Sequence, residues 1–380
     1  MRWRLLLLGV VLAGLAACAP APRAAPSVPP PAAAAASERP SSAGAAPAAT
    51  APAAPAGEGD RAAPPAPAAV KVGLAYTASD AGLLIAMDRG HYQEQNLQVD
   101  FEKIESAANL LPPLGAAQVD VGGNALTPGY LNAWARGVRI RVVADKGHNG
   151  PGFSYQGLVV RKDLWDSGVR GPADLKGRRL ALPSFGSGAE PAIDRFMRQG
   201  GLRVSDLDLT QLAFGDMPGA LAGGQIDVAH STEPFITRMA ADGSGVILAR
   251  ENDYSPNHQS AVLYYAEPFA AERVDVARRF MVAYLQAVRE YNDAFRKHDP
   301  ALRPEIVSIL SKYTTVKDPA LYDRMQLAGL DPDGEVNVES LRADAEYWLE
   351  NNYQEERTPV DELIDRSFAQ YARQQLGPYQ

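Results

Sequence analysis

Two pairs of short segments recur along this chain at one spacing, and this internal repeat limits the possible folds more than any other feature. The segments "VKVGLAYTASDAG" and "GRRLALPSFGSGA" begin at Val70 and Gly177, while "LGAAQVDVGGN" and "LAGGQIDVAHS" begin at Leu114 and Leu221. The members of each pair lie 107 residues apart (177 minus 70, and 221 minus 114). Because the order of the predicted elements agrees as well as the letters, the repeat predicts two structurally similar lobes.

Short apolar runs alternate with helical stretches in both halves, which predicts an α/β fold with parallel-rich sheets. We expect strands in the first lobe at 70–76, 97–104, 119–122 and 138–144, and in the second lobe at 179–183, 207–213, 226–229 and 246–249. Two further strand-like runs, 157–165 and 260–269, we interpret as lobe-margin strands that form the two crossovers.

These boundaries divide the folded part into a first lobe of residues 70–162 and 260–380 and a second lobe of residues 163–259. After the second crossover, apolar residues at helical spacing between Val276 and Phe295 predict a buried helix. A further helix is expected from Val336 onward.

The first residues indicate export. Arg2 and Arg4 precede an apolar run from Leu5 to Leu15, which is too short to cross a membrane as a mature helix. The following "LAAC" resembles the cleavage box of bacterial lipoproteins, which predicts a signal peptide at 1–17 and a lipid on Cys18. The alternative is an ordinary signal peptide with a chance cysteine.

Residues 18–69 are rich in Ala and Pro and lack the apolar side chains needed to offset ordering entropy, so we expect a disordered tether. At roughly 3.1 Å per residue it reaches on the order of 150 Å at most. A formal net charge of −8 without a basic cluster argues against nucleic-acid binding. Because Cys18 is the only cysteine, its lipidation leaves no thiol for disulfides, metal ligation or catalysis.

Open parallel sheets bind ligands beyond the carboxyl ends of their strands, so two facing sheets predict a ligand cleft between the lobes. The ligand-binding candidates at these strand ends are, in the first lobe, Tyr76, Thr77, Asp80, Ser106, Asn124 and His148, and in the second lobe, Ser184, Gly186, Ser187 and Glu233. The repeat pairs Thr77 with Ser184 and Asn124 with Ser231.

The turn around Ser184 follows a predicted strand and opens a predicted helix, so its N–H groups favour an anion or a carbonyl oxygen. Alternatively, Ser187 and Glu190 form a capping box that satisfies the helix itself. Lys146 would favour an anionic group, whereas Asp80 and Glu233 would favour an amine, unless they are solvated loop carboxylates.

Neither a metal nor a cofactor is predicted. His148 has no second His or Cys at ligand spacing, so a loop position is the alternative to ligand contact. Tyr76, Tyr155, Phe185 and Phe235 could stack on a planar ligand or fill the floor beneath it.

From Val70 to Phe295 the chain resembles the substrate-binding proteins of ABC importers, of the nitrate/sulfonate/taurine and thiamine-pyrimidine type. The runs that carry the resemblance include "GAAQVDVGGNALTP", "ADLKGRRLALPSFGSGAE" and "LAGGQIDVAHSTEPF". The resemblance implies the type II periplasmic-binding-protein fold and delivery of a small molecule to a membrane permease and ATPase. It places ligand contacts at Tyr76, Thr77, Asn124, Ser184 to Ser187 and Glu233. We also expect a monomer.

Two departures from the family pattern bear on function. The cysteine-rich motif of an enzymatic branch that makes the thiamine pyrimidine is absent, and Thr232 stands where relatives often have an aromatic residue before Glu-Pro. We therefore expect a lipid-anchored binding protein of the cell envelope for a sulfonate-, amine- or pyrimidine-like molecule, and no enzyme. A pyrimidine-synthase-type enzyme and a ligand-binding domain that feeds a sensor are the alternatives.

Overall fold

The computed structural model describes residues 66–104 and 106–380 of the chain. The predicted signal peptide, the lipidation site Cys18 and residues 18–65 of the predicted tether lie outside the described residues. The tether was expected to extend to residue 69, but Ala68 and Ala69 form the start of the first strand, β1 Ala68–Leu74. Within the described part, no helix combines the length and apolar character that a membrane crossing requires.

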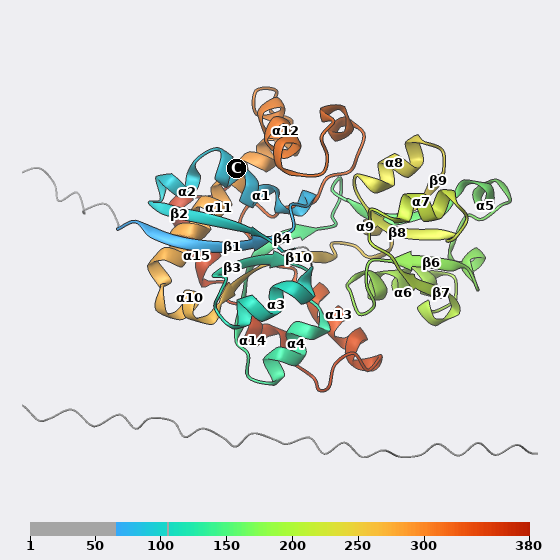
Figure 1. Ribbon diagram of the computed structural model, residues 1–380, viewed down its shortest axis with the longest axis horizontal. Coiled ribbons are helices and arrows are strands. Elements are labelled where there is room, and N and C mark those ends of the chain that lie inside the picture. Colours follow the sequence, from blue (N-terminus) through green and yellow to red (C-terminus); the bar gives the residue numbers. More distant parts are fainter. Residues whose placement is uncertain (1–65, 105) are drawn as a thin grey trace, which may run out of the picture. The chain divides into compact units, whose positions relative to one another are not determined.

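The first sheet has five strands in the order β2–β1–β3–β10–β4 (Figure 1). Their bounds are β1 Ala68–Leu74, β2 Leu97–Lys103, β3 Val121–Asn124, β4 Ile140–His148 and β10 Gln259–Ala266. β1 runs parallel to β2 and β3, whereas β10 is antiparallel to β3 and β4. The sheet is therefore mixed rather than purely parallel.

The second sheet repeats this arrangement in the order β7–β6–β8–β5–β9. Its strands are β5 Gln156–Arg161, β6 Arg179–Leu182, β7 Asp208–Gln211, β8 Val228–Thr232 and β9 Gly245–Arg250. Asn124 of β3 pairs with β10, and Ser231 of β8 pairs with β5 at the corresponding place. The structural equivalence of Asn124 and Ser231 that the repeat predicts is therefore confirmed, as are all eight predicted strands.

The interpretation of 157–165 and 260–269 as lobe-margin crossover strands is wrong. β5 lies between β8 and β9, and β10 lies between β3 and β4, so each is an inner strand of its sheet. The predicted range 70–162 of the first lobe therefore includes a strand of the second sheet, and β5 is counted with the second lobe below. The chain passes between the sheets in residues 149–155 and 251–258, which we call the first and second crossovers.

Helices surround both sheets. In the first lobe they are α1 Ala81–Asp88, α2 His91–Glu94, α3 Ala107–Gly115, α4 Pro128–Ala135, α10 Glu267–Glu272, α11 Val274–Phe295, α12 Leu302–Tyr313, α13 Val338–Glu350, α14 Val360–Leu363 and α15 Ser367–Leu376. Between and after the strands of the second lobe lie α5 Lys162–Asp166, α6 Ala189–Gln199, α7 Met217–Ala222, α8 Phe235–Ala241 and α9 Glu251–Tyr254. Short 3₁₀ helices occur at Ala78–Asp80, Pro172–Leu175, Val204–Asp206 and Pro319–Asp323.

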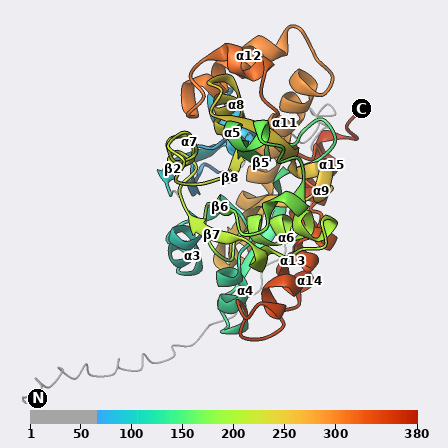
Figure 2. The ribbon, with the colours of Figure 1, turned by 90° about the vertical axis from the view of Figure 1, so that its right-hand side faces the viewer.

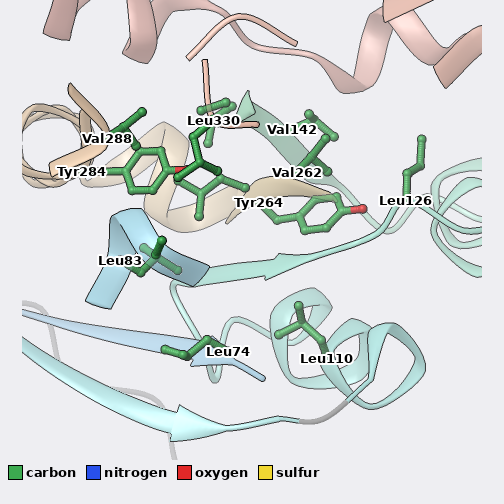
Figure 3. Close-up of a cluster of buried hydrophobic side chains, with 14 of the residues drawn as sticks. Leu74, Leu83, Leu110, Leu126, Val142, Val262, Tyr264, Tyr284, Val288 and Leu330 are labelled. Atoms are coloured by element: carbon green, nitrogen blue, oxygen red, sulfur yellow. The ribbon is translucent and has the colours of Figure 1, made fainter. Parts of the chain in front are cut away.

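The core of the first lobe lies where α1 and α11 pack beside the sheet (Figure 3). Tyr284 and Val288 of α11 are buried, as the helical stripe predicts. Gly82 of α1 allows this close approach, because a Cβ there would lie 2.7 Å from atoms of both side chains. This packing fixes α1, and therefore the loop between β1 and α1 that holds the first group of candidate residues.

Candidate functional site

The loop after β1 folds around Asp80. Asp80 is fully buried, and its Oδ2 accepts hydrogen bonds from the Thr77 N–H at 2.7 Å and from Thr77 Oγ1 at 2.9 Å. Thr77 Oγ1 also lies 3.1 Å from Ser79 Oγ. Tyr76, just before Thr77, has a φ of 58°, which turns the chain from the strand into the 3₁₀ helix Ala78–Asp80. Burial, and then Asp80, raise the pKa of Tyr76, so its hydroxyl remains protonated at neutral pH.

Lys146 neutralises Asp80. Its Nζ lies 2.7 Å from Asp80 Oδ1 and donates to Ser79 Oγ at 2.9 Å, and the residue is only 2% exposed. β4 continues to His148, so Lys146 lies inside the strand, beyond the predicted strand end at residue 144. A Cβ on Gly123 would lie 2.5 Å from Lys146 Cε, so this glycine makes room for the buried cation. From the sequence, Lys146 was expected to favour an anionic ligand group and Asp80 an amine. In the structure these two side chains neutralise each other instead.

Asn124 and Ser106 stand at the starts of the loops or helices that follow their strands. Asn124 Oδ1 accepts from the Ala125 N–H at 2.9 Å, and Ser106 Oγ accepts from the Asn109 N–H at 3.2 Å as the N-cap of α3. Ser231, the equivalent of Asn124, is fully buried, and its hydroxyl has no hydrogen-bond partner among the described residues.

The turn between β6 and α6 does not form the predicted capping box with Ser187 at the N-cap. Gly188 is the N-cap, and Ser187 Oγ donates to the Ser184 carbonyl at 2.7 Å instead of accepting from the helix. Glu190 Oε2 accepts from the Gly186 N–H at 2.9 Å. The prediction is wrong because Gly186, with a φ of 68°, bends the backbone back over the first helical turn. That N–H is therefore already satisfied within the protein.

This turn lies against the first lobe. A Cβ on Gly186 would lie 3.6 Å from Pro128 Cγ, at the start of α4, and 3.2 Å from the ring of Tyr353. Phe185 beside it is 49% exposed, the only large exposed hydrophobic side chain in the described part of the chain. The strand-end regions of β3 and β6 therefore meet across the two lobes.

Glu233 is a buried, fully engaged carboxylate rather than a solvated one. Its Oε1 pairs with Arg250 Nη1 at 2.8 Å, and its Oε2 accepts from the Thr237 N–H at 3.0 Å, in the first turn of α8. The Gln326 N–H of the first lobe lies 3.4 Å from Oε1. The Glu233 N–H donates to the Tyr155 carbonyl at 2.8 Å.

His148 lies at the carboxyl end of β4, with Nδ1 3.0 Å from Asp145 Oδ2. Burial opposes its protonation, but Asp145 outweighs burial and raises the pKa of His148. Its backbone exchanges two hydrogen bonds with Gly329, of 2.9 and 3.0 Å. This pairing with the segment before α13, together with Asp145, explains the position of His148, so no ligand is needed to hold it there.

Tyr155 of the first crossover lies beside the loop after β1. Its hydroxyl is 2.7 Å from Ser260 Oγ, which donates to the Gly147 carbonyl at 2.9 Å. A Cβ on Gly147 would lie 2.9 Å from Ser79 Cβ and 3.3 Å from the Tyr155 hydroxyl. Thus Thr77, Asp80 and Tyr155, which are far apart in the sequence, are part of one polar cluster.

A second polar network is centred on Glu251 in the second crossover. Glu251 is fully buried and contacts His258 Nδ1 at 2.5 Å, His230 Nε2 at 2.7 Å and Asn149 Nδ2 at 3.0 Å. His258 Nε2 lies 2.8 Å from Asp344 Oδ2 in α13. The network therefore connects both crossovers, β8 and a C-terminal helix.

The electrostatics of this network follow from its alternating charges. Burial opposes ionisation of Glu251, but His258 and then His230 outweigh it and lower the pKa of Glu251 to about 2. Burial also opposes protonation of His258, but Asp344 and Glu251 outweigh it and raise the pKa of His258 to about 10. Glu251 is therefore an anion and His258 a cation throughout the neutral pH range.

Two surface hollows of the first lobe lie away from these clusters. One, of about 470 Å³, is lined by residues that include Arg141 and Glu267, and the other, of about 530 Å³, by residues that include Lys71 and Arg273. Neither contains a predicted ligand residue. In residues 66–104 and 106–380, no group of three or more His, Cys, Asp or Glu side chains is arranged to hold a metal ion.

The contribution of the C-terminal segment to the turn between β6 and α6 was not predicted. Tyr353 lies against Gly186 and donates to Glu190, although it follows that turn by more than 160 residues. No motif or spacing marks it, because the contact depends on how α13 passes between the lobes. Tyr155 was among the aromatic residues expected near a ligand, and it lies in the polar cluster.

Comparison with known proteins gives a consistent result. The sequence model described as "NMT1/THI5 like" matches residues 77–294, more than half of the chain. The taurine-binding periplasmic protein of Escherichia coli (strain K12) is 23% identical over 255 residues, which cover 66% of this chain and 75% of that protein.

Solved structures show that the similarity includes the fold. The alkanesulfonate-binding protein from Xanthomonas axonopodis pv. citri, bound to MOPS, superposes with a TM-score of 0.62 at 21% identity, covering 80% of this chain and 100% of that chain. A desulfurization enzyme superposes with a TM-score of 0.59 at 16% identity, covering 81% of this chain and 99% of that one. The predicted type II periplasmic-binding-protein fold is confirmed.

Proposed function

Because the chain belongs to the NMT1/THI5-like family, we propose that it is an extracytoplasmic solute-binding protein that delivers a small sulfonate to an ABC importer. The observation that carries the proposal is the meeting of two strand-end regions across the lobes, with Gly186 of the second lobe close to Pro128 of the first. A ligand between these strand-end regions contacts both lobes. It stabilises their closed arrangement because it binds the closed state more tightly than the open state.

The proposed ligand is held by neutral donors. The cation of Lys146 is paired with Asp80, and Glu233 is paired with Arg250, so neither pair offers a free charge. The Ser184 hydroxyl, and those backbone N–H groups near Thr77, Asn124 and Ser184 that are not used inside the turns, then bind the sulfonate oxygens. The ligands named for the taurine-binding and alkanesulfonate-binding relatives share the sulfonate group but not the amine, which supports a sulfonate over the amine- and pyrimidine-like ligands that the sequence leaves open.

Isothermal titration calorimetry with the purified protein tests this proposal. Taurine and short alkanesulfonates are expected to bind, while the corresponding amines and a thiamine pyrimidine are not. Ser184→Ala should weaken sulfonate binding at least about tenfold, which corresponds to the loss of one hydrogen bond to a charged group. Ser205→Ala, at an exposed position of the same lobe, is the matched control. Binding of an amine or pyrimidine alone would refute the sulfonate assignment.

The likeness to a desulfurization enzyme keeps one alternative function open to test. In that alternative, water cleaves the C–S bond of a sulfinate: the carbon takes a proton, the sulfur takes the hydroxyl, and sulfite is released. Incubation of the protein with aryl and alkyl sulfinates, followed by sulfite detection, distinguishes the two functions. Our proposal expects no sulfite above the level without protein.

We further propose that the chain is a monomer tethered to the membrane surface by a lipid on Cys18, where it meets its permease and ATPase. The residues "LAAC" and the Ala/Pro-rich segment that follows support this anchor. Radiolabelled palmitate is expected to label the wild-type protein in cells, and Cys18→Ser should remove the label. Labelling that survives this substitution would exclude Cys18 as the lipid site.

A further inference from the structure

Glu190 of the second lobe is a buried carboxylate that binds only neutral donors. The residue is 5% exposed, and it accepts from the Gly186 N–H at 2.9 Å, from the Tyr347 hydroxyl at 3.2 Å and from the Tyr353 hydroxyl at 3.0 Å. In the described part of the chain no Lys, Arg or His forms an ion pair with it. A buried carboxylate is tolerated only while its hydrogen bonds are made, so these three donors stabilise its burial.

Two of the three donors come from the other lobe. Tyr347 lies in α13 and Tyr353 in the segment that follows, which is attached to α4 of the first lobe. Asn132 of α4 donates to the Tyr353 carbonyl at 3.0 Å and accepts from the Glu355 N–H at 3.1 Å. Farther along, Thr358 Oγ1 donates to the Leu131 carbonyl at 3.2 Å. The backbone of Tyr353 therefore belongs to the first lobe while its side chain reaches the second.

The ring of Tyr353 also covers the backbone of the turn. A Cβ on Gly186 would lie 3.2 Å from Tyr353 Cδ1. Burial, and then the Glu190 carboxylate, raise the pKa of Tyr353 to about 12, so its hydroxyl stays protonated and able to donate at neutral pH. Figure 2 shows α6 beside α13, and Arg195 of α6 pairs with Asp344 of α13 at 2.6 Å next to these contacts.

We propose that Tyr353 is a positioning residue that couples the turn Ser184–Ser187 to the first lobe through Glu190 and thereby favours the closed arrangement. When the lobes separate, Glu190 loses two of its three protein donors, so opening breaks two hydrogen bonds to a charged acceptor. Tyr353 thus shifts the open–closed equilibrium before any ligand binds. The expected effect of Tyr353 on the rate of ligand release rests on the proposed function. Its expected effect on the open–closed equilibrium of the ligand-free protein does not.

The test is the distance between the lobes in the ligand-free protein. Nitroxide labels at Gln93→Cys and Ser205→Cys, both exposed, report this distance by double electron–electron resonance in the full chain carrying Cys18→Ser. Tyr353→Phe keeps the ring and removes the hydroxyl. It should raise the ratio of open to closed protein about tenfold, and Tyr347→Phe/Tyr353→Phe should raise it further.

Tyr371→Phe is the matched control, because Tyr371 lies in α15 and its ring stacks under Arg278, a contact that Phe retains. This variant should show the wild-type distance distribution, and unchanged circular dichroism confirms that each variant is folded. Stopped-flow release of taurine adds a functional readout, in which Tyr353→Phe should raise the dissociation rate about tenfold with little change in the association rate.

An unchanged distance distribution in both tyrosine variants would overturn the proposal. Failure of taurine to bind would instead count against the proposed ligand and leave the distance measurement as the decisive result.

Discussion

His258→Gln tests the buried charge network, because it removes the cation between two buried carboxylates. Glu251 and Asp344 have side chains that are 1% and 2% exposed, and His258 contacts both at 2.5 and 2.8 Å. Removal of one member of a buried ionic cluster typically costs about 3–5 kcal/mol of unfolding free energy. The raised pKa of His258, about 10 against 6.5 for the free group, gives a charge-linked contribution on the order of 5 kcal/mol.

The sign of the pH dependence follows from the raised pKa. The contribution of His258 is fully present below pH 6.5, where the unfolded state also binds the proton, and it is lost as the pH rises toward 10. Glu251, with a pKa of about 2, stays ionised throughout this range and does not titrate. The difference in stability between wild type and His258→Gln should therefore decrease by about 1.4 kcal/mol per pH unit between about pH 7 and pH 10.

Urea unfolding followed by circular dichroism at pH 5.5 and pH 9.5 measures this difference. We expect His258→Gln to be less stable by about 3–5 kcal/mol at pH 5.5 and to have lost most of that deficit by pH 9.5. His298→Gln is the control, because His298 is exposed and its change should have no comparable effect. An equal deficit at both pH values would refute the ionic account of this network.

Three other experiments test the strand-end clusters. Lys146→Met should lower the free energy of unfolding in urea by about 3–5 kcal/mol, and adding Asp80→Asn should restore most of it; no recovery in the double variant would contradict a pairing role. Gly123→Ala should cost about 1–3 kcal/mol in the same assay, because its Cβ would displace Lys146, and a neutral result would mean that the lysine moves freely. Gly186→Ala should lower the thermal stability by about 1–2 kcal/mol, since its φ is 68° and Tyr353 lies 3.2 Å from the added atom; wild-type calorimetric unfolding would argue against a rigid turn.

Much of the fold could be predicted because strands and internal repeats follow from local sequence patterns. The eight strands and the buried face of α11 follow from periodicity, and the offset of 107 residues already pairs Asn124 with Ser231. The inner positions of β5 and β10 were not predicted. Their unbroken apolar runs, Leu158–Val160 and Ala261–Ala266, are typical of strands covered on both faces and were the available signal.

The partners of the candidate side chains were less predictable, because they depend on contacts between distant segments. Asp80 was expected to contact a ligand or solvent, but β4 extends far enough to bring Lys146 against it. Glu190 was expected to cap its own helix, and it satisfies Gly186 instead because that residue adopts a left-handed conformation. The hydroxyl of Tyr353 reaches Glu190 only through the path of the chain after α13.

Hydrogen–deuterium exchange with and without a bound sulfonate tests the central claim most directly, because it reports on both lobes at once. If the ligand lies between the strand ends, the amides of residues 75–80 and 184–188 should become protected together when taurine or an alkanesulfonate is added. Protection confined to one lobe, or to the hollow lined by Arg141 and Glu267, would contradict a binding site shared by the two lobes.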